Sequence, residues 1–318
     1  MMSRKRERLL RWVGAGAVIA AACVLPAPWK LAVLPLLVPL LYAPAGTRIP
    51  VLVYHSIHPD RNWMGAPDLV VTPERFAAQM NWLARHGFKT LHMDVLYALR
   101  ARQRRRRRVA AVHFDDGYGD AVAHAEPALA DNGLKATVYV APGLLADRPP
   151  HPQLPPRDDL SPTDFLGLPA MVAAHRRGVL EFQCHGWTHR PLDQVPPEEW
   201  DYEIGDSRAL LAGALAAPVR HLCFPRDSAP AALLPRLPML NYLTWTGGDH
   251  DNRVGTDPHR VGRIYVTQSG WDALDAIRFP AEIYLFLGHY WLWPAVLVGN
   301  VLTRVAWKRA GMAERRTP

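Results

Sequence analysis

The 318-residue sequence predicts an α/β fold, a parallel β/α barrel, flanked by hydrophobic membrane segments. Short apolar runs that alternate with segments of helical spacing indicate the barrel. Two apolar stretches, at 12–29 and 283–303, each beside basic residues, indicate the membrane segments. We therefore predict an N-terminal membrane anchor at 1–45, one large domain at 46–282, and a C-terminal hydrophobic segment with a basic tail at 283–318.

The first apolar stretch follows a basic N-terminus. Eighteen uncharged residues from Trp12 are just long enough to span the hydrocarbon of a bilayer. Because basic flanks stay in the cytoplasm, we expect an uncleaved anchor whose far end leaves the cell interior. A further apolar stretch at 31–45 leaves open a hairpin of two short spans, which would return the domain to the cytoplasm.

The formal charge of +8 is unevenly distributed. Residues 1–11, 100–108 and 304–318 together carry more than this whole charge, so the rest of the chain is acidic. A nucleic-acid groove needs basic residues spread along one face among aromatic platforms. We therefore predict no nucleic-acid partner. For the arginine run at 100–108, a solvated loop and contact with anionic lipid both stay open.

The elements of the domain follow in order. A strand at 51–54 is closed by His55, and Thr72 with Pro73 marks the start of a helix that ends at Gly87. A short strand and a helix then lead into the arginine run. The remaining predicted elements are strands at 109–114, 136–141 and 179–184, helices at 168–177 and 198–215, a proline-rich loop at 142–163, and a strand ending at Phe224.

Two adjacent carboxylates stand where a predicted strand stops. The apolar run at 109–114 ends at Asp115 and Asp116, and glycines at 117 and 119 predict a turn. In a parallel sheet, residues at the carboxyl ends of strands lie at the mouth where ligands bind. Two neighbouring carboxylates need a compensating cation or arginine, so they suggest a metal site; an ordinary Asp-Gly surface turn is the alternative.

Two histidines follow another predicted strand. His185 and His189 come directly after the run at 179–184, at spacing i, i+4. Histidines at this spacing can bind one ion, and with one carboxylate they make a triad that leaves positions open for water and substrate. A pair of ordinary surface histidines is the alternative. The placement of both pairs after strands favours a metal centre.

These motifs resemble a known family. HFDDG at 113–117 and HGWTH at 185–189 are similar to the first two motifs of the polysaccharide deacetylases, carbohydrate esterase family 4 with the NodB homology domain. Four further segments resemble the branch that deacetylates biofilm poly-N-acetylglucosamine: VLVYHS at 51–56, VTPERFAAQMNWLARHGF at 71–88, ATVYV at 136–140 and GRIYV at 262–266. The resemblance implies a distorted, incomplete (β/α)7 barrel. Gly186, where Ser or Thr is usual, and CFPRD at 223–227 depart from the pattern.

The resemblance also implies roles for the motif residues. Asp116, His185 and His189 would hold a divalent metal, most readily Zn²⁺, and Asp115 would act as the general base. His55 is our candidate for the general acid. His289, in Leu287-Gly288-His289, stays open as its rival because it mimics a late family motif.

Several further residues are assigned to the same mouth. Arg263 would hold Asp115 by a charge-assisted bond, with Arg226 as the alternative. The backbone of Phe224, Pro225 and Arg226 would donate to the oxyanion. Sugar stacking and plain packing stay open for two tryptophans, Trp187 and Trp63.

The resulting hypothesis is a membrane-anchored, metal-dependent hydrolase acting on amide bonds. It would remove N-acetyl groups from N-acetylhexosamine residues of a cell-surface or biofilm polysaccharide, on the periplasmic or extracytoplasmic side. Its expected partners are an N-acetylated glycan, membrane lipid, and polysaccharide synthesis or export machinery. A deacetylase of a lipid-linked sugar and an inactive glycan-binding export subunit are the alternatives.

The last apolar stretch, at 283–303, contains Trp291 and Trp293 and is followed by five basic residues. We expect a second span with a cytoplasmic basic flank, which would leave the domain outside. An interfacial helix or a hydrophobic docking helix is the alternative, since His289, Pro294 and Asn300 interrupt the stretch.

Overall fold

The computed structural model describes residues 49–103, 108–147, 151–153, 164–246, 252, 256–266 and 283. The chain divides into two compact units, and the described residues belong almost entirely to the unit Ile49–Asp275. Among them, no helix is both long and apolar enough to cross a bilayer. The predicted anchor, the core of the arginine run at 104–107 and nearly all of the C-terminal segment with His289 lie outside the described residues.

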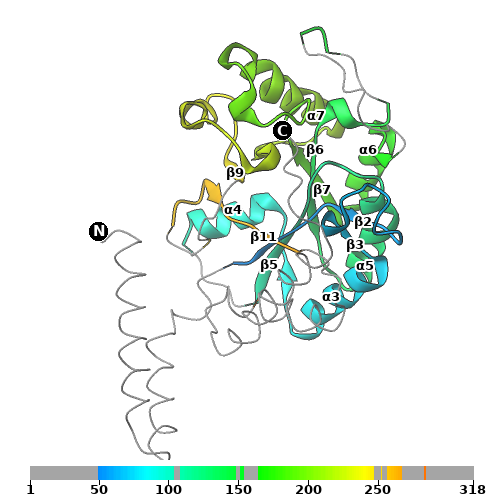
Figure 1. Cartoon of the computed structure of the whole chain (residues 1–318). Helices are drawn as coiled ribbons and strands as arrows, with labels where there is room; N and C mark the ends of the chain where they lie inside the picture. The colour runs from blue at the N-terminus through cyan, green and yellow to red at the C-terminus, as the bar shows by residue number, and fades with distance from the viewer. Residues whose placement is uncertain are drawn as a thin grey trace, which may run out of the picture. The chain divides into compact units, whose positions relative to one another are not determined.

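The domain is built on one curled sheet in which every pairing is parallel (Figure 1). Its strand order is β10-β9-β8-β7-β6-β5-β1-β11, and β4 also pairs with β5. A separate parallel pair, β2 (Ser56–Ile57) with β3 (Val70–Val71), follows β1. The strands of the main sheet are β1 (Val51–Tyr54), β4 (Lys89–Thr90), β5 (Val109–Phe114), β6 (Ala136–Val140), β7 (Leu180–Cys184), β8 (His221–Cys223), β9 (Thr244–Thr246), β10 (Arg260–Val261) and β11 (Ile264–Tyr265).

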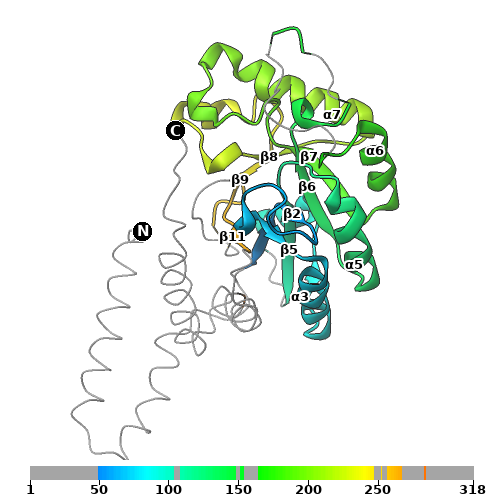
Figure 2. The same ribbon diagram turned by 45° about the vertical axis from the view of Figure 1, so that its right-hand side comes forward.

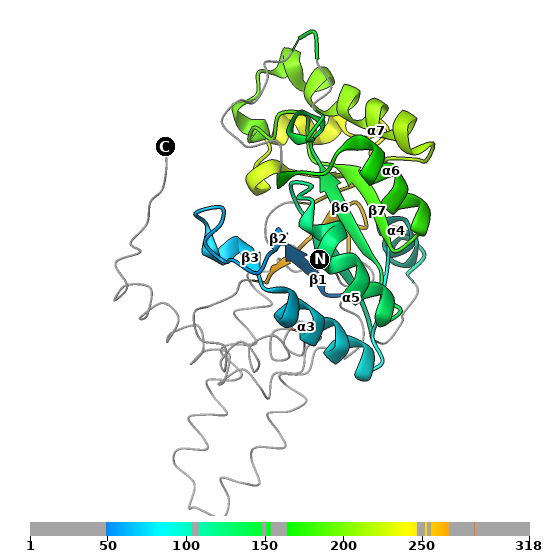
Figure 3. The same cartoon turned by 90° about the vertical axis from the view of Figure 1, so that its right-hand side faces the viewer.

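The two ends of this strand order are joined by one short segment. β10 pairs with β9, whereas β11, which begins after only two intervening residues, pairs with β1. The dark blue β1 and the gold β11 lie side by side in Figure 3. The sheet therefore has the form of an incomplete β/α barrel, as the sequence predicts, and Arg263 lies at the break between its two ends.

Helices cover the outside of the sheet, and their ends follow the sequence signals. Figure 2 shows α5 (Glu126–Asp131), α6 (Leu168–Arg177) and α7 (Ser207–Leu215) along strands β6 and β7. In α3 (Pro73–Arg85), the Thr72 hydroxyl accepts a hydrogen bond from the Arg75 amide, which confirms the predicted N-cap. α6 ends at Gly178 in the left-handed conformation. The predicted helix at 198–215 is a π-helical segment, Asp201–Asp206, followed by α7.

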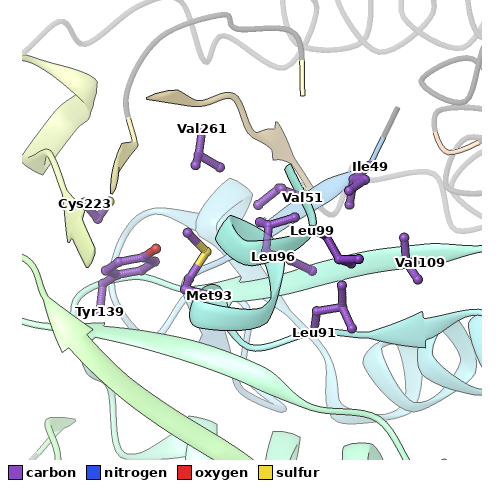
Figure 4. Packing of buried hydrophobic residues seen from close by; sticks show 11 residues of the cluster. Ile49, Val51, Leu91, Met93, Leu96, Leu99, Val109, Tyr139, Cys223 and Val261 are labelled. Carbon is purple, nitrogen blue, oxygen red and sulfur yellow. The ribbon is translucent and has the colours of Figure 1, made fainter. Parts of the chain in front are cut away.

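A further helix, α4 (Met93–Ala101), crosses the amino ends of the strands. Its apolar side packs on the inward-facing side chains of the strands in the cluster shown in Figure 4. Buried Arg100 donates to the carbonyl of Arg260 at the start of β10. The first helical amide, of Met93, donates to buried Glu181 at the start of β7. Through these contacts α4 covers the amino ends of the strands.

The two described cysteines lie on neighbouring strands but are not paired. Cys184 and Cys223 end β7 and β8, which are hydrogen-bonded neighbours, and both are buried free thiols. Cys184 contacts the Ser207 hydroxyl on α7, on the helix-covered side of the sheet. Cys223 belongs instead to the inner cluster. The two thiols thus face opposite sides of the sheet, as side-chain alternation requires.

Candidate active site and metal centre

The predicted site residues follow the carboxyl ends of four strands. His55 follows β1, Asp115 follows β5, His185 follows β7 and Phe224 follows β8. Because these strands run parallel in one curled sheet, their carboxyl ends bring together residues that are far apart in the sequence. The sequence prediction that both motifs share one mouth is consistent with this arrangement.

Three side chains converge on one buried point. The Nε2 atoms of His185 and His189 lie 3.3 Å and 2.9 Å from the Oδ1 atom of Asp116. One ligand atom from each of the three residues lies within 4.8 Å of the others. Neither histidine contact has hydrogen-bond geometry, so Asp116 Oδ1 is buried without a hydrogen-bond partner among the described residues.

The donor set fits a divalent cation. The Nδ1–H of His185 donates to the Cys223 carbonyl oxygen at 2.9 Å, which leaves Nε2 with a free lone pair toward Asp116. Two imidazoles and a carboxylate are ligands that Zn²⁺ accepts, and three protein ligands leave a position open. Asp116 and His189 both have left-handed backbone, with φ of 71° and 61°. Such conformations cost free energy and are held where the surroundings determine them.

A second triplet, made by Asp115, His185 and Cys223, has a similar spread of potential ligand atoms. It fits a cation less well than the first triplet. Both oxygens of Asp115 already accept from Arg263. Burial raises the pKa of the Cys223 thiol, so its neutral form is favoured. Of the two triplets, Asp116 with the two histidines therefore has the chemistry that suits a cation better.

Asp115 is held by Arg263, as the sequence predicts. Arg263 Nη1 donates to both oxygens of Asp115 at 2.8 Å, and both side chains are nearly inaccessible to solvent. Burial alone would raise the pKa of Asp115, but the charges of Arg263 and the nearby histidines outweigh it, so this pKa is lowered. A carboxylate that stays ionised inside the protein can accept a proton.

The alternative arginine does not take this role. Arg226 is exposed, with left-handed backbone at φ 53°, whereas Arg263 makes the contact with Asp115. The backbone of this loop is also partly committed. The amide of Phe224 donates to the Thr246 carbonyl at 3.1 Å, and Pro225 has no N–H. Of the three residues proposed as oxyanion donors, Arg226 is the one whose amide is left for that role.

His55 stands beside the same carboxylate. Its Nε2 lies 4.0 Å from Asp115 Oδ2, and its side chain is 15% exposed. The ring stacks on Tyr265, with 6.2 Å between the centroids. His55 therefore lies at the rim of the site, where a side chain can reach both Asp115 and an entering ligand.

Buried Glu203 fixes the loop that carries the two histidines. Its Oε1 accepts from the amides of Trp187 and Thr188 at 3.0 Å and 2.7 Å. Gly186 has φ of 77°, and a Cβ there would lie 3.0 Å from Glu203 Oε1. A glycine at this position, where Ser or Thr is usual, therefore suits the left-handed backbone and the close approach of this carboxylate.

The two tryptophans differ in setting. Trp187 is 5% exposed, and its ring meets His151 edge-on at 4.5 Å, which favours packing over sugar stacking. Trp63 is partly exposed, and its indole N–H donates to the Ser56 hydroxyl at 3.0 Å. Ser56 in turn donates to Asp120, so Trp63 belongs to the same wall of the mouth as the His55 loop.

Four residues of the site were not assigned a role from the sequence. Glu203 and Cys223 support the histidines, while Asp227 and Tyr265 contact Arg263. No local pattern marks Glu203, since it lies in a helical segment among other acids. One feature of the sequence could have suggested a role for Tyr265: it lies two residues after Arg263, and side chains at i and i+2 of an extended segment point to the same face.

Comparison with known proteins identifies the class. Residues 102–245 match the family model described as polysaccharide deacetylase. The family model and the relative described next together support a polysaccharide deacetylase domain over this part of the chain. The chain is 25% identical over 164 residues to YxkH of Bacillus subtilis (strain 168), a protein named for the same family. The match covers 51% of each protein, so the chain spans about half the length of this relative.

Solved structures share the fold. The deacetylase PplD of Streptococcus pyogenes, in complex with acetate, has a TM-score of 0.60 at 23% identity, covering 69% of this chain and 92% of that one. IcaB of Ammonifex degensii has a TM-score of 0.60 at 20% identity, covering 73% and 97%. At these identities the likeness supports the fold, and it agrees with the β/α barrel predicted from the sequence.

Proposed function

We propose that the protein is a metal-dependent hydrolase that removes N-acetyl groups from N-acetylhexosamine residues of a cell-surface or biofilm polysaccharide. One observation carries the proposal: two imidazoles converge on an unpartnered oxygen of Asp116, and beside them Asp115 is kept ionised. The family description supports a polysaccharide substrate. The biofilm assignment rests on the sequence motifs alone.

Asp116, His185 and His189 would hold the metal, and Zn²⁺ suits this ligand set best. When bound, the ion would polarise the amide carbonyl and make a nearby water more acidic. His185 is pre-oriented for this role by its bond to the Cys223 carbonyl, which fixes the ring and its tautomer.

Asp115 would accept the proton of the attacking water. Its oxygens face Arg263 and His55, and the arginine keeps the carboxylate oriented and charged. Addition of water to the carbonyl carbon forms a tetrahedral oxyanion. Of the three proposed donors, the backbone N–H of Arg226 is the one that would donate a hydrogen bond to it.

His55 would donate the proton that the leaving amine requires. The C–N bond breaks with its electron pair on nitrogen, and a protonated imidazole at the rim can place a proton there. His55 lies 4.0 Å from Asp115, so one side of the site holds both the base and the acid. The rival His289 lies outside the described residues.

The hydrophobic stretches outside the described residues extend the proposal to location and partners. We propose an N-acetylated glycan as substrate, attachment to membrane lipid through the ends of the chain, and a catalytic domain on the periplasmic or extracytoplasmic side. Proximity to polysaccharide synthesis or export machinery would follow from such a location.

Acetate release tests this function. The full-length protein, purified in detergent, is incubated with soluble N-acetylglucosamine oligomers and with other N-acetylated glycans, with and without a chelator. We expect release that the chelator abolishes and that zinc restores. A His185→Ala, His189→Ala double variant should lose both metal and turnover. Equal zinc in this variant and in the wild type would exclude the assigned ligands, and release insensitive to chelation would exclude a metal-dependent reaction.

A further inference from the structure

Arg263 is shared by two carboxylates rather than one. While its Nη1 donates to Asp115, its Nη2 donates to Asp227 Oδ1 at 2.9 Å and contacts the Tyr265 hydroxyl at 3.1 Å. The arginine side chain is only 2% exposed. The N–H groups of a buried guanidinium need hydrogen-bond acceptors. Asp115 accepts from Nη1, and Asp227 accepts from Nη2.

Tyr265 connects this ion pair to the proposed general acid. Its hydroxyl donates to Asp227 Oδ2, and its ring lies over the Arg263 guanidinium at 5.5 Å. The same ring stacks on His55, with planes 23° apart. Since His55 in turn approaches Asp115, the contacts form a closed circuit through five side chains: Asp115, Arg263, Asp227, Tyr265 and His55.

The backbone is arranged to build this circuit. Asp227 has φ of 54° and directly follows Arg226 at 53°, and two successive left-handed residues without glycine are costly. The turn aims the Asp227 carboxylate back toward Arg263. Arg263 and Tyr265, separated by one residue, both lie in the segment 260–265 that joins the two ends of the sheet. This segment therefore supplies two of the five side chains of the circuit.

We propose that Asp227 and Tyr265 are positioning residues for the deacetylase reaction, holding the base Asp115, through Arg263, and the acid His55 in one fixed arrangement. The inference rests on the proposed function. Neither residue contacts the assigned metal ligands in the described contacts, so their loss should slow turnover while metal is retained. Tyr265 would act in two separable ways, through its hydroxyl on Asp227 and through its ring on His55.

Paired substitutions test this role with N-acetylglucosamine oligomers as the probe. Asp227→Asn and Tyr265→Phe should each lower kcat by about tenfold, with KM and zinc content within about twofold of wild type. The Asp227→Asn, Tyr265→Phe double variant should be no slower than the slower single variant, because each substitution disrupts the same hydrogen bond, between the Tyr265 hydroxyl and the Asp227 carboxylate. Tyr265→Ala should be slower than Tyr265→Phe, since it also removes the ring from His55.

Two matched controls lie away from the site. Tyr97→Phe removes the hydroxyl of a different tyrosine beside a histidine ring, that of His259 at 5.5 Å. Asp201→Asn breaks another aspartate–arginine pair, with Arg236 at 2.9 Å. Both should keep kcat within about twofold. Wild-type kcat in Asp227→Asn and Tyr265→Phe would overturn the proposal, as would fully multiplicative losses in the double variant or losses that accompany zinc loss.

A second measurement does not need turnover, so it separates this inference from the function itself. Carbethoxylation of His55 by diethyl pyrocarbonate is followed by peptide mass spectrometry in the full-length protein. Its rate should rise severalfold in Tyr265→Ala and stay within about twofold in Tyr265→Phe, which keeps the ring. An unchanged rate in Tyr265→Ala would overturn the positioning of His55. Absence of acetate release from the wild type would instead contradict the proposed function.

Discussion

At the scale of single residues, two neighbouring aspartates have different surroundings and should have separable roles. Asp115 is bound on both oxygens by Arg263, whereas Asp116 turns a free oxygen toward two histidines. Asp115→Asn should therefore keep zinc and lose turnover by about 100-fold or more, and Asp116→Asn should lose both. Elemental analysis and acetate release measure the two properties, and normal zinc in both variants would contradict the assignment.

A second prediction at this scale concerns Gly186. Its φ is 77°, and a Cβ added at this residue would lie 3.0 Å from Glu203 Oε1, so the Glu203 carboxylate would have to shift slightly to admit it. Gly186→Ala should lower the free energy of unfolding by about 1–2 kcal/mol, the cost of a left-handed residue with a Cβ. Urea unfolding followed by tryptophan fluorescence measures it.

The control for this substitution is Gly213, an exposed glycine inside α7 with open space around its Cβ position. Gly213→Ala should stabilise the protein by about 0.5–1 kcal/mol, because alanine is the better helix former. Equal effects of the two substitutions would show that the conformation of Gly186 is not the cause.

Site residues could be predicted from the sequence where they lie together in a short motif. Asp115, Asp116, His185 and His189 form short motifs directly after strands, so their chemistry and their placement can both be recognised. Asp227 could not be assigned, because no short motif marks it and the direction of its side chain toward Arg263 depends on two left-handed residues. Only the closed sheet brings such pairs together.

At the scale of elements, α4 is fastened to the strand starts by polar contacts. Asp94 in its first turn accepts from buried His221 at the start of β8, at 2.9 Å, and pairs with Arg220. The hydrogen bond from His221 is the main cause that lowers the pKa of Asp94 to about 2. A lowered carboxyl pKa stabilises the folded state above the unfolded value, and this contribution is lost as the pH falls through the folded one.

This linkage gives a third prediction. Asp94→Asn should lower the free energy of unfolding at pH 7, by less than about 1 kcal/mol because the carboxylate is 43% exposed and screened. The difference from wild type should shrink between about pH 4 and pH 2, where the wild-type carboxyl takes up its proton. Unfolding curves at several pH values measure it, and a difference that is constant down to pH 2 would exclude this role of Asp94.

The predictability of the elements varies with their length and capping. α3 and α6 were predicted nearly to the residue, since Thr72 caps one and Gly178 ends the other. β9, of three residues, and the pair β2–β3, of two residues each, carry too little periodicity to be recognised. Their strand conformation depends on neighbours that are distant in the sequence.

At the scale of the whole molecule, the fold separates support from chemistry. α4 closes the amino ends of the strands, and the site residues gather at the carboxyl ends. The segment 260–265 joins the two ends of the strand order and carries Arg263. Alternation of strands and helices in the sequence predicts such a barrel. It does not predict that β10 pairs with β9 while β11 pairs with β1, because that pairing forms only when the sheet curls and its two ends approach each other.

The final prediction concerns how the chain is placed at a membrane, which only the sequence addresses. Basic residues flank the apolar stretches at 12–29 and 283–303 on their outer sides, and basic flanks stay in the cytoplasm. The proposed topology therefore puts both chain ends inside and the domain outside. A reporter active only outside the cytoplasm should work when fused after residue 46 or near residue 280, and should fail after residue 318. Activity after residue 318 would exclude the second span, and inactivity after residue 46 would favour the hairpin that returns the domain to the cytoplasm.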